Sequence, residues 1–475
     1  MNKVLVIIIV ILTITMMLAP VASASSKGGG GLINDFLYQP QLIAAQVSSN
    51  SVIPNAIPYC LLNTGAAFIC YGPNALRIAY GYPSDLDGTG QTILIVDAFG
   101  SPTITNDLSH FDNVFGIKPP PSFTTLCPPG GCPIFDPSDT HHGQVDWAIE
   151  TSLDVEYAHA MAPGANIVLV IASTNSGNAI NSAETQAIKL YPGSIMSQSF
   201  GIPEYSIHAN NAQLSQANKN YIAAQAARIT VFASAGDKGA NNASPFINPL
   251  FPSSHPLVTS VGGTMGLPYV GPFRCPSGTT CTAGLVQIMG PCTPSSTLLP
   301  GCSVLGYGGE QVWDEAFFGA VTGGAPSSLF NMPIYQSGLV YKDLSGSTIP
   351  VSTRTTADVS YDAGVNGGVL VYTSFLSAPT FLLLGGTSVG SPQWAAIAAL
   401  ANQAAGHSLG FLNNAIYKIG NNITLYQNDF HDITTGSNFL LPMLLGFSAS
   451  KGWDPPSGWG TPSVKDLVPD LVANA

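Results

Sequence analysis

Ser388 is the residue of this sequence whose surroundings most suggest nucleophilic chemistry. It follows an apolar run and two glycines, in Gly385-Gly386-Thr387-Ser388, and precedes a helix-like run over residues 393–405. A serine at a strand-to-helix turn often caps the helix with its hydroxyl. It can also act as a nucleophile, because free N–H groups and the helix dipole stabilise a developing oxyanion. Ser388 falls at the predicted helix N-cap, so the rest of the chain must decide between these roles.

A nucleophilic serine needs a base, and the sequence offers two. Glu150 and Asp154 lie four residues apart in a helix-like stretch over residues 143–161, so their carboxylates share one helix face. Two close carboxylates share a proton, which raises one pKa and suits acid and base catalysis at low pH. The plain interpretation of these acids is a solvated face. Alternatively, His141 or His142 completes a Ser-His-Asp triad with Asp97.

Asp237 separates these two routes. It follows a strand-like run, in Ser234-Ala235-Gly236-Asp237. A carboxylate repels an oxyanion, whereas a protonated carboxyl group donates a hydrogen bond to it, so a role there requires acidic surroundings or a strongly raised pKa. Taken alone, this Gly-Asp pair is an ordinary turn. Asp97 is either an outer carboxylate coupled to the Glu150–Asp154 pair or a plain strand-end residue, and we favour the strand-end interpretation.

Strand-like and helix-like stretches alternate along the chain, which predicts a mainly parallel sheet covered by helices on both faces. The strands fall at residues 92–96, 166–171, 194–200, 229–233 and 257–261, and the helices at residues 106–115, 143–161, 179–190 and 210–228. We expect residues 369–372 and 381–384 to continue the sheet, and residues 265–350 to form long surface loops. Sites form at the carboxyl ends of parallel strands, where Asp97, Asp237 and Ser388 are expected.

Composition argues against a nucleic acid partner, and the N-terminal stretch predicts secretion. Only 8% of the 475 residues are charged, and 26 acidic residues outnumber 14 Lys and Arg, which argues against nucleic acid binding. A chain with few ion pairs also suits acidic surroundings. Lys3, an apolar run and Ala22-Ser23-Ala24 predict a signal peptide over residues 1–24, and no later stretch is a convincing membrane span.

Eight cysteines fall in four sequence-local pairs, for which disulfide bonds are the natural interpretation in a secreted protein. The pairs are Cys60/Cys70, Cys127/Cys132, Cys275/Cys281 and Cys292/Cys302. Residues 25–52 are glycine-rich at first and lack periodicity, so we expect a flexible N-terminal segment or a short pro-segment. Residues 53–475 contain no convincing linker and are expected to form one domain.

Residues 68–465 resemble the sedolisin family of serine-carboxyl peptidases, which are relatives of subtilisin. Each motif is moderately specific, and together they are strong: Glu150-Thr151-Ser152-Leu153-Asp154, Ser197-Gln198-Ser199-Phe200-Gly201, Ser234-Ala235-Gly236-Asp237 and Gly386-Thr387-Ser388. The resemblance implies a subtilisin-like three-layer αβα fold. It also implies that Ser388 attacks the peptide carbonyl, that Glu150 takes its proton and that Asp154 orients Glu150. Protonated Asp237 and the Ser388 N–H would bind the oxyanion.

The resemblance further implies one Ca²⁺ ion in the C-terminal region. Its ligands would be the carboxylates of Asp432 and Asp454 and the carbonyls of Ile433, Ser450 and Gly452. Carboxylates and carbonyls in glycine-rich turns form the hard oxygen set that Ca²⁺ prefers. Ser450 stands where the family has glycine, and the stretch between the predicted leader and residue 68 is short compared with the long pro-domain that the family usually carries.

The sequence thus predicts a secreted, extracellular, monomeric endopeptidase that acts on polypeptides at acidic pH, with no membrane partner after signal removal. Two alternatives stay open. One is a neutral peptidase that uses Asp97, His142 and Ser388. The other is a catalytically inactive secreted binding protein on the same scaffold.

Overall fold

The computed structural model describes residues 36–48, 60–64, 67–207, 211–267, 275–290, 303–441 and 445–475. The predicted signal peptide, residues 1–24, and the cysteine pair Cys292/Cys302 lie outside these ranges. Within them, none of the helices is both long enough and apolar enough to cross a lipid bilayer.

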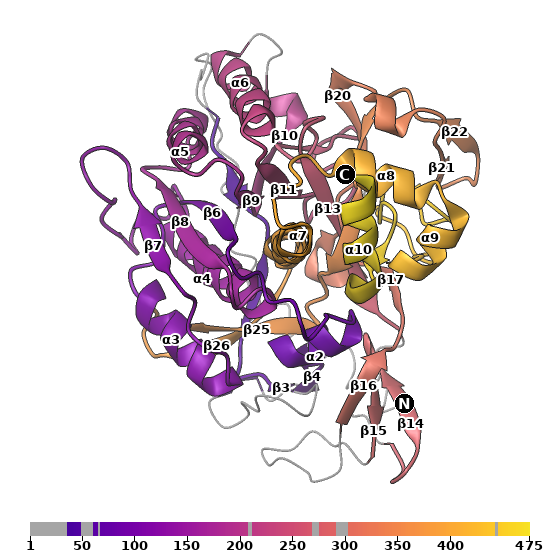
Figure 1. Ribbon diagram of the computed structural model, residues 1–475, viewed down its shortest axis with the longest axis horizontal. Coiled ribbons are helices and arrows are strands. Elements are labelled where there is room, and N and C mark those ends of the chain that lie inside the picture. Colours follow the sequence, from indigo (N-terminus) through magenta and orange to yellow (C-terminus); the bar gives the residue numbers. More distant parts are fainter. Residues whose placement is uncertain are drawn as a thin grey trace, which may run out of the picture.

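A mainly parallel β-sheet forms the centre of the molecule (Figure 1). Its strands are β6 (Thr92–Ala98), β7 (Phe123–Leu126), β8 (Asn166–Ala172), β9 (Ile195–Gln198), β11 (Thr230–Ser234), β13 (Thr259–Gly266), β17 (Glu310–Val312) and β24 (Val359–Asp362). They are ordered β17-β13-β11-β9-β6-β8-β7, and β24 also pairs with β13. The β13–β17 pair is antiparallel and the other pairs are parallel. The predicted parallel sheet is confirmed.

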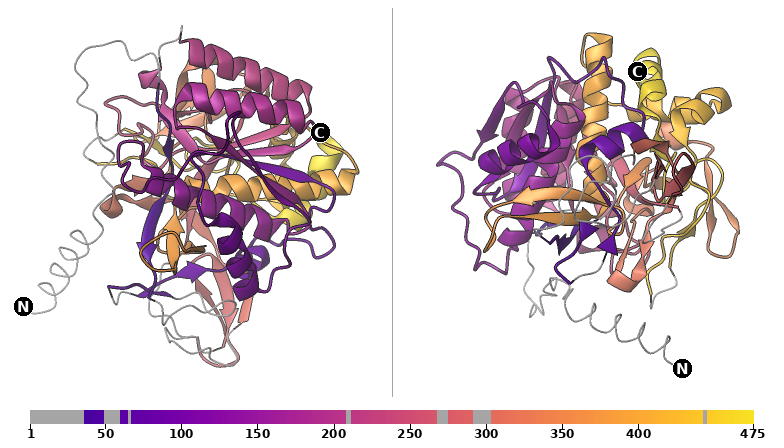
Figure 2. Two further views of the ribbon diagram at one scale, coloured as in Figure 1. Left: turned by 90° about the vertical axis from the view of Figure 1, so that its left-hand side faces the viewer. Right: turned by 90° about the horizontal axis from the view of Figure 1, so that it is seen from below.

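Helices cover both faces of this sheet (Figures 1 and 2). One face carries α3 (Ile104–Phe115), α4 (Gln144–Met161) and α7 (Gly390–Ala405), and the other carries α5 (Gly177–Leu190) and α6 (Ala212–Ala226). Side chains alternate between the faces of a strand, so Ile93 and Ile95 of β6 pack in the first core whereas Leu94 and Val96 pack in the second. This double burial confirms the three-layer αβα arrangement.

Strands β25 (Gly368–Thr373) and β26 (Thr380–Gly385) do not continue the central sheet, so that prediction is wrong. With β2 (Ile43–Gln46) and β5 (Cys70–Tyr71) they form a separate four-stranded sheet of order β2-β26-β25-β5, in which β25 and β26 are antiparallel. The connection over residues 374–379 is shorter than the crossover of about a dozen residues that parallel strands require, so β25 and β26 pair antiparallel. The strand that leads to Ser388 therefore approaches from outside the central sheet.

Residues 36–48 differ from the flexible segment that the sequence predicted. Strand β1 (Gln39–Pro40) pairs with β10 (Phe200–Pro203), and β2 (Ile43–Gln46) pairs with β26. Phe36 and Tyr38 are buried in the second core. These contacts join residues distant in sequence, which local periodicity cannot reveal. The packed structure therefore begins before residue 53, and removal of residues 25–52 as a pro-segment stays a prediction.

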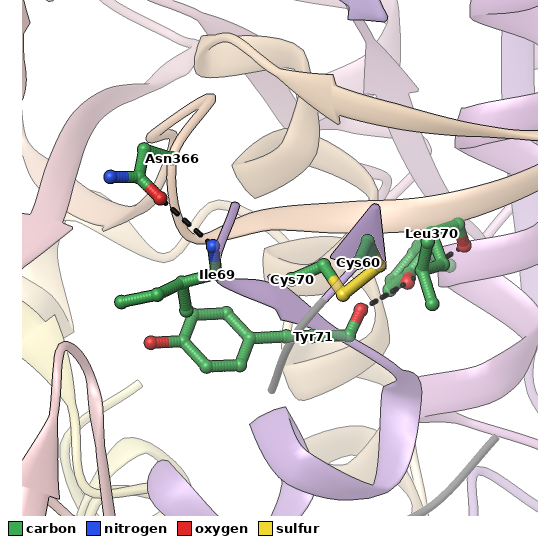
Figure 3. The surroundings of a disulfide bond; sticks show 7 residues. Cys60, Ile69, Cys70, Tyr71, Asn366 and Leu370 are labelled. Carbon is green, nitrogen blue, oxygen red and sulfur yellow. Dashed lines mark hydrogen bonds between the residues drawn. A yellow bond between two sulfur atoms is a disulfide. The ribbon is translucent and has the colours of Figure 1, made fainter. Parts of the chain in front are cut away.

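Three of the four predicted disulfide bonds are confirmed: Cys60–Cys70, Cys127–Cys132 and Cys275–Cys281. The first lies between β3 (Cys60–Leu61) and β5 (Cys70–Tyr71), as Figure 3 shows. Next to it, the Tyr157 hydroxyl of α4 donates to the carbonyls of Tyr71 (3.3 Å) and Leu370 (3.0 Å). These two hydrogen bonds join β5 and β25 of the four-stranded sheet to α4.

Residues 265–350 are not only surface loops, which corrects a further prediction. Strands β14 (Thr280–Ala283), β15 (Val286–Met289) and β16 (Ser303–Tyr307) form an antiparallel sheet that projects from one end of the molecule (Figure 1). The remaining elements are β4 (Ala67–Phe68), α2 (Pro73–Ala79), β12 (Leu250–Phe251), β18 (Asp314–Glu315), β19 (Ala320–Val321), β20 (Pro326–Asn331), β21 (Val340–Asp343), β22 (Thr348–Pro350), β23 (Thr353–Thr355), α8 (Asn413–Gly420), α9 (Ile423–Asp429), β27 (Phe430–His431), β28 (Phe447–Ser448), β29 (Thr461–Pro462) and α10 (Val464–Asn474).

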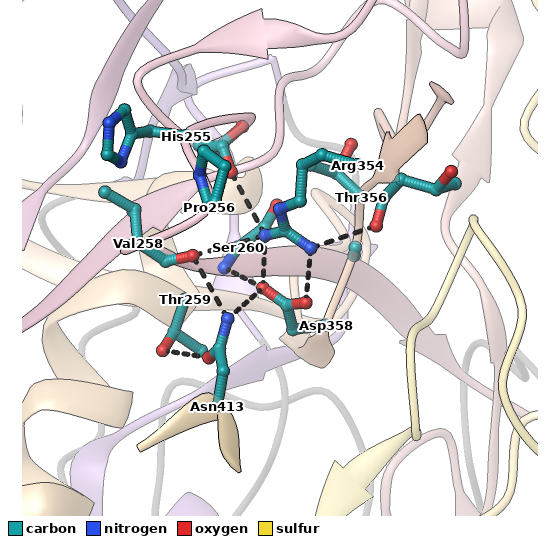
Figure 4. A network of polar contacts seen from close by, with 12 residues as sticks. His255, Pro256, Val258, Thr259, Ser260, Arg354, Thr356, Asp358 and Asn413 are labelled. Atoms are coloured by element: carbon teal, nitrogen blue, oxygen red, sulfur yellow. Dashed lines mark hydrogen bonds and ion pairs between the residues drawn. The ribbon is translucent and has the colours of Figure 1, made fainter. Parts of the chain in front are cut away.

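A buried ion pair lies beside the paired strands β13 and β24 (Figure 4). The Arg354 guanidinium contacts both oxygens of Asp358, at 2.6 and 2.5 Å, and both side chains are fully buried. Asp358 also accepts hydrogen bonds from the Ser260 N–H (2.7 Å), the Tyr417 hydroxyl (2.6 Å) and the Asn413 amide (3.3 Å). The charge of Asp358 is therefore well compensated in the interior.

Candidate active site

Ser388 lies in a short 3₁₀ turn, Thr387–Val389, between β26 and α7. The prediction that it caps the helix is wrong, because α7 begins only at Gly390 and the extra turn separates the two. The Ser388 hydroxyl instead donates to the Ser199 carbonyl at 3.2 Å. Gly386, with a φ of 125°, adopts a conformation that side-chain-bearing residues rarely reach and so permits the sharp turn.

The two carboxyl groups of α4 are buried beside this turn. Glu150 and Asp154 are both 0% exposed, so the interpretation of a solvated helix face is wrong. Burial, and then the charges of Asp154 and Asp97, raise the pKa of Glu150, whereas an interaction with Ser388 lowers it. Neither oxygen of Glu150 has a hydrogen-bond partner within the described part of the chain. Glu150 is thus a buried, proton-retaining neighbour of the serine.

Asp154 is held by a residue that the sequence reasoning did not assign a role. The Ser199 hydroxyl donates to Asp154 Oδ1 at 2.8 Å, and the Ser199 carbonyl accepts from Ser388. Burial and the charge of Asp97 raise the pKa of Asp154, while interactions with Ser199 and Glu150 lower it. Ser199 could have been found, since it stands in the motif Ser197 to Gly201.

Asp97 belongs to the same group of acids, which supports its interpretation as a carboxylate coupled to the pair over that of a plain strand-end residue. It is fully buried at the end of β6, and its charge raises the pKa values of both Glu150 and Asp154. Burial raises its own pKa to about 7. Three carboxyl groups in one interior region cannot all ionise together, so they hold protons to a higher pH than free acids do.

Asp237 presents a free carboxyl oxygen to the serine turn. Its Oδ1 accepts the N–H and the hydroxyl of Thr387, each at 2.8 Å, while Oδ2 has no partner among the described residues. A β-carbon on Gly386 would lie 2.6 Å from that Oδ2, so Asp237 borders the glycine that precedes Thr387. Burial raises the pKa of Asp237 to about 7. Protonated, Oδ2 is a hydrogen-bond donor aimed at this turn.

The structure does not bring the alternative triad together. The His142 ring binds Asp139, with Nδ1 2.8 Å from Oδ2, and its side chain is one-third exposed. Within the described ranges, no contact joins His142 to Asp97 or Ser388. The groups that approach the Ser388 hydroxyl are carboxyls and a main-chain carbonyl, and not an imidazole.

The expected calcium ligands also lie near one another. The N–H of Gly452 donates to both oxygens of Asp432, at 3.1 and 3.3 Å, and the N–H of Ser450 donates to Asp454 Oδ2 at 2.7 Å. Burial and then the charge of Asp432 raise the pKa of Asp454 to about 8. Among the described residues, no cationic side chain pairs with either carboxyl. Ile433 is the next residue after Asp432. The Tyr426 hydroxyl also donates to Asp432 Oδ1 at 2.8 Å, and the N–H and hydroxyl of Ser457 donate to Asp454 Oδ1 at 3.0 and 2.8 Å. Two adjacent carboxyls are of the residue type that binds a divalent cation, and each carboxyl oxygen accepts a hydrogen bond in this structure.

Comparison with known proteins finds relatives of this chain among peptidases. No family model matches the chain. Over 427 residues the chain is 27% identical to kumamolisin of Bacillus sp. (strain MN-32). This match covers 86% of this chain and 65% of kumamolisin. Over 416 residues it is 25% identical to sedolisin of Pseudomonas sp. (strain 101), covering 85% of this chain and 62% of that protein.

A solved structure of a sedolisin has a similar fold. Pseudomonas sedolisin, a serine-carboxyl proteinase complexed with two molecules of pseudo-iodotyrostatin, matches with a TM-score of 0.64 and 23% identity, over 86% of this chain and all of that chain. The chain is therefore similar to the sedolisin family in sequence and in fold. It spans less than two thirds of the length of these two curated sedolisin-family relatives.

Proposed function

We propose that this protein is a secreted serine-type endopeptidase of the sedolisin family that hydrolyses polypeptides at acidic pH. The observation that carries the proposal is the environment of Ser388. Its side chain interacts with the buried Glu150, whose pKa the charge of Asp154 raises, and the free oxygen of Asp237 borders the same turn. Secretion is supported by the signal-like leader and the disulfide bonds.

In the proposed reaction, Ser388 Oγ attacks the carbonyl carbon of the substrate and its proton passes to Glu150. Asp154, held by Ser199, stabilises the proton on Glu150 by sharing it. The oxyanion accepts hydrogen bonds from the Ser388 N–H and from protonated Asp237. Glu150 then protonates the leaving amine, and water hydrolyses the acyl-enzyme with Glu150 as base once more.

Acid activity follows from the same groups. Asp237 can donate only while it holds a proton, and its pKa of about 7 allows this throughout the acidic range. The shared charge of Glu150, Asp154 and Asp97 leaves one of these carboxyls able to accept a proton while its neighbours stay neutral.

We further propose that Asp432, Asp454 and the carbonyls of Ile433, Ser450 and Gly452 hold one Ca²⁺ ion in a structural role. The ion would neutralise the two adjacent carboxyls and fix the loop over residues 450–454, which the N–H contacts already place against them.

Hydrolysis of a denatured protein at about pH 3 tests the proposal. Ser388→Ala is expected to abolish turnover, and Glu150→Gln to lower kcat by about 10²–10⁴-fold, the usual contribution of a general base. Asp146→Asn, one turn earlier on α4, is the matched control and should retain activity. A neutral optimum with loss on His142→Ala would support the triad alternative, and no hydrolysis at any pH would support a binding protein.

A further inference from the structure

Two asparagines of this chain stand in the acceptor motif for N-linked oligosaccharides, Asn-x-Ser/Thr. They are Asn242, in Asn242-Ala243-Ser244, and Asn422, in Asn422-Ile423-Thr424. A glycan is bulky and polar, so in an exported protein the motif can be used only where its side chains lie at the surface. The structure places the two motifs in opposite environments and so distinguishes them.

Asn242 is part of the folded interior. It is 5% exposed, and its Nδ2 donates to the Asn248 carbonyl at 2.7 Å. A β-carbon on Gly236 would overlap Asn242 Oδ1, so the amide packs directly against the residue before Asp237. Ser244, the third residue of the motif, is 1% exposed. A glycan on Asn242 would therefore displace the loop that packs beside the candidate oxyanion donor.

Asn422 lies on the surface, in the short connection between α8 and α9. Residues 421–424 are all exposed. The side-chain oxygen of Asn422 accepts the N–H groups of Thr424 at 3.1 Å and of Leu425 at 3.4 Å. Its side-chain nitrogen donates to no group within the described part of the chain. The fold thus uses the oxygen of this amide and leaves its nitrogen unoccupied.

The main chain at this connection is fixed without that nitrogen. The Asn422 N–H donates to the Ile419 carbonyl at 2.9 Å, and the Asn422 carbonyl accepts the Tyr426 N–H at 2.8 Å. Gly420 packs so closely against the Trp459 ring that a β-carbon there would overlap it. Replacing one Nδ2 hydrogen by a sugar therefore removes no hydrogen bond of the fold. Helix α9 lies at the edge of the molecule, where sugars can extend into solvent (Figure 1).

Thr424 completes the motif on the same exposed turn. It is exposed, and its hydroxyl makes no hydrogen bond to the other described residues. The motif requires the amide of the asparagine and the hydroxyl two residues later. Both groups are accessible at Asn422 and Thr424, whereas both are buried at Asn242 and Ser244.

We propose that Asn422 carries an N-linked oligosaccharide and that Asn242 does not. The inference rests on the secretion that the proposed function includes, because such glycans are transferred to exported chains, and it goes beyond the peptidase reaction. The donor belongs to the class of lipid-linked oligosaccharide diphosphates.

The transfer balances without an oxidant or a reductant. Asn422 Nδ2 bonds to C1 of the first sugar, and the bond from C1 to the phosphate oxygen breaks. The lipid diphosphate leaves with that electron pair, and the displaced Nδ2 proton passes to a base of the transferase. Asn422 Oδ1 keeps both of its hydrogen bonds in the product.

The protein exported by its source cells is mapped by mass spectrometry of peptides that span both motifs. We expect a glycan on Asn422, localised by fragmentation of the peptide, and an unmodified Asn242. An exported protein with an unmodified Asn422 would overturn the inference. A glycan on Asn242 would overturn the argument from burial, and with it the distinction between the two motifs.

Substitutions in the same source cells test the motif itself. Thr424→Ala should remove the glycan although Asn422 and its two accepted hydrogen bonds remain, because the motif needs a hydroxyl residue at this position. Thr424→Ser should keep the glycan. Asn421→Gln, at the neighbouring exposed asparagine outside the motif, is the matched control and should keep it as well. A glycan that survives in Thr424→Ala would lie elsewhere and overturn the inference.

Two further readouts separate this inference from the proposed function. Thr424 lies outside the candidate active site, so Thr424→Ala should hydrolyse a denatured protein at acidic pH as fast as wild type. An exported, glycosylated protein that hydrolyses nothing at any pH would refute the peptidase and leave the inference standing. A chain that stays inside the cells with its leader attached would refute secretion, and the inference would fail with it.

Discussion

Thr387 and Asp237 are joined by two hydrogen bonds of 2.8 Å, and both end on the same oxygen of the carboxyl group. The N–H and the hydroxyl of Thr387 thereby fix Oδ1 as an acceptor. A proton on Asp237 must then reside on Oδ2, the oxygen that borders Gly386. Thr387 thus determines that Asp237 donates its proton from Oδ2.

Asp237→Asn should change the alkaline limb of the pH–activity profile. Wild-type kcat/KM is expected to fall as pH rises through about 7, because burial raises the pKa of Asp237 to that value and only the protonated form donates. The amide donates at every pH, so the variant should keep a larger fraction of its own maximal activity at about pH 8. An unchanged alkaline limb in the variant would exclude Asp237 as its cause.

Ser199→Ala should lower kcat with little change in KM. The hydroxyl donates to Asp154 at 2.8 Å, and loss of a hydrogen bond to a charged group corresponds to about ten- to hundredfold in rate. Ser197→Ala is the matched control on the same segment, since that hydroxyl contacts Ser391 at 2.8 Å and no carboxyl. Steady-state kinetics of both variants at one acidic pH checks the difference.

Much of the architecture was predictable because strand and helix periods are local. Thr92 to Val96 and Gly143 to Met161 were recognised within two residues of their observed ends. Contacts between distant segments were not predictable. Nothing near Gln41 indicates its partner Ser199, and nothing near Thr380 indicates that β26 leaves the central sheet.

The residues of the candidate site were largely predictable, whereas the interactions between their side chains were less so. Glu150, Asp154, Asp237 and Ser388 stand in recognisable motifs, whereas the part of Asp97 became visible only through its burial beside two other acids. A strand-end aspartate in an isolated sequence carries no sign of which charges it faces.

The folded protein should be more stable in acid than at neutral pH. Burial raises the pKa values of Asp97, Glu184 and Asp237 to about 7, whereas unfolded Asp and Glu titrate near 4. A raised folded-state pKa stabilises fully below the unfolded value, and this stabilisation is lost as pH rises through the folded value.

Thermal unfolding of Ser388→Ala, which avoids self-digestion, should therefore show a Tm at least about 5 °C lower at pH 8 than at pH 4. Adding Asp97→Asn to that background removes one of the titrating groups and should reduce the difference. A Tm that rises over this interval would contradict the assignment.

Arg354→Met should destabilise the protein by about 3–5 kcal/mol, because it leaves the buried charge of Asp358 without its cationic partner. Denaturant unfolding at neutral pH, again in Ser388→Ala, measures the change. Lys189→Met removes an exposed cation from α5 and should change stability by less than about 0.5 kcal/mol. Equal effects of the two substitutions would refute a special role for the buried pair.

A calcium chelator should lower the Tm of Ser388→Ala, and added Ca²⁺ should restore it, because a bound ion stabilises the folded state by mass action. Asp454→Asn should abolish this response by removing one of the two carboxylates. Asp85→Asn, at an exposed position, should keep it. A chelator effect that survives in Asp454→Asn would place the ion elsewhere.

The pairing of the N-terminal segment determines which part of it meets the serine turn. Gln39 pairs with Gly201 and Ile43 pairs with Gly385, and between them the Ser388 N–H donates to the Gln41 carbonyl at 3.2 Å. These two strand pairings set the register, and the side chains of Gln41 and Leu42 do not. Substitutions at these two positions should therefore leave the same carbonyl at Ser388, whereas an inserted residue would bring a different carbonyl there.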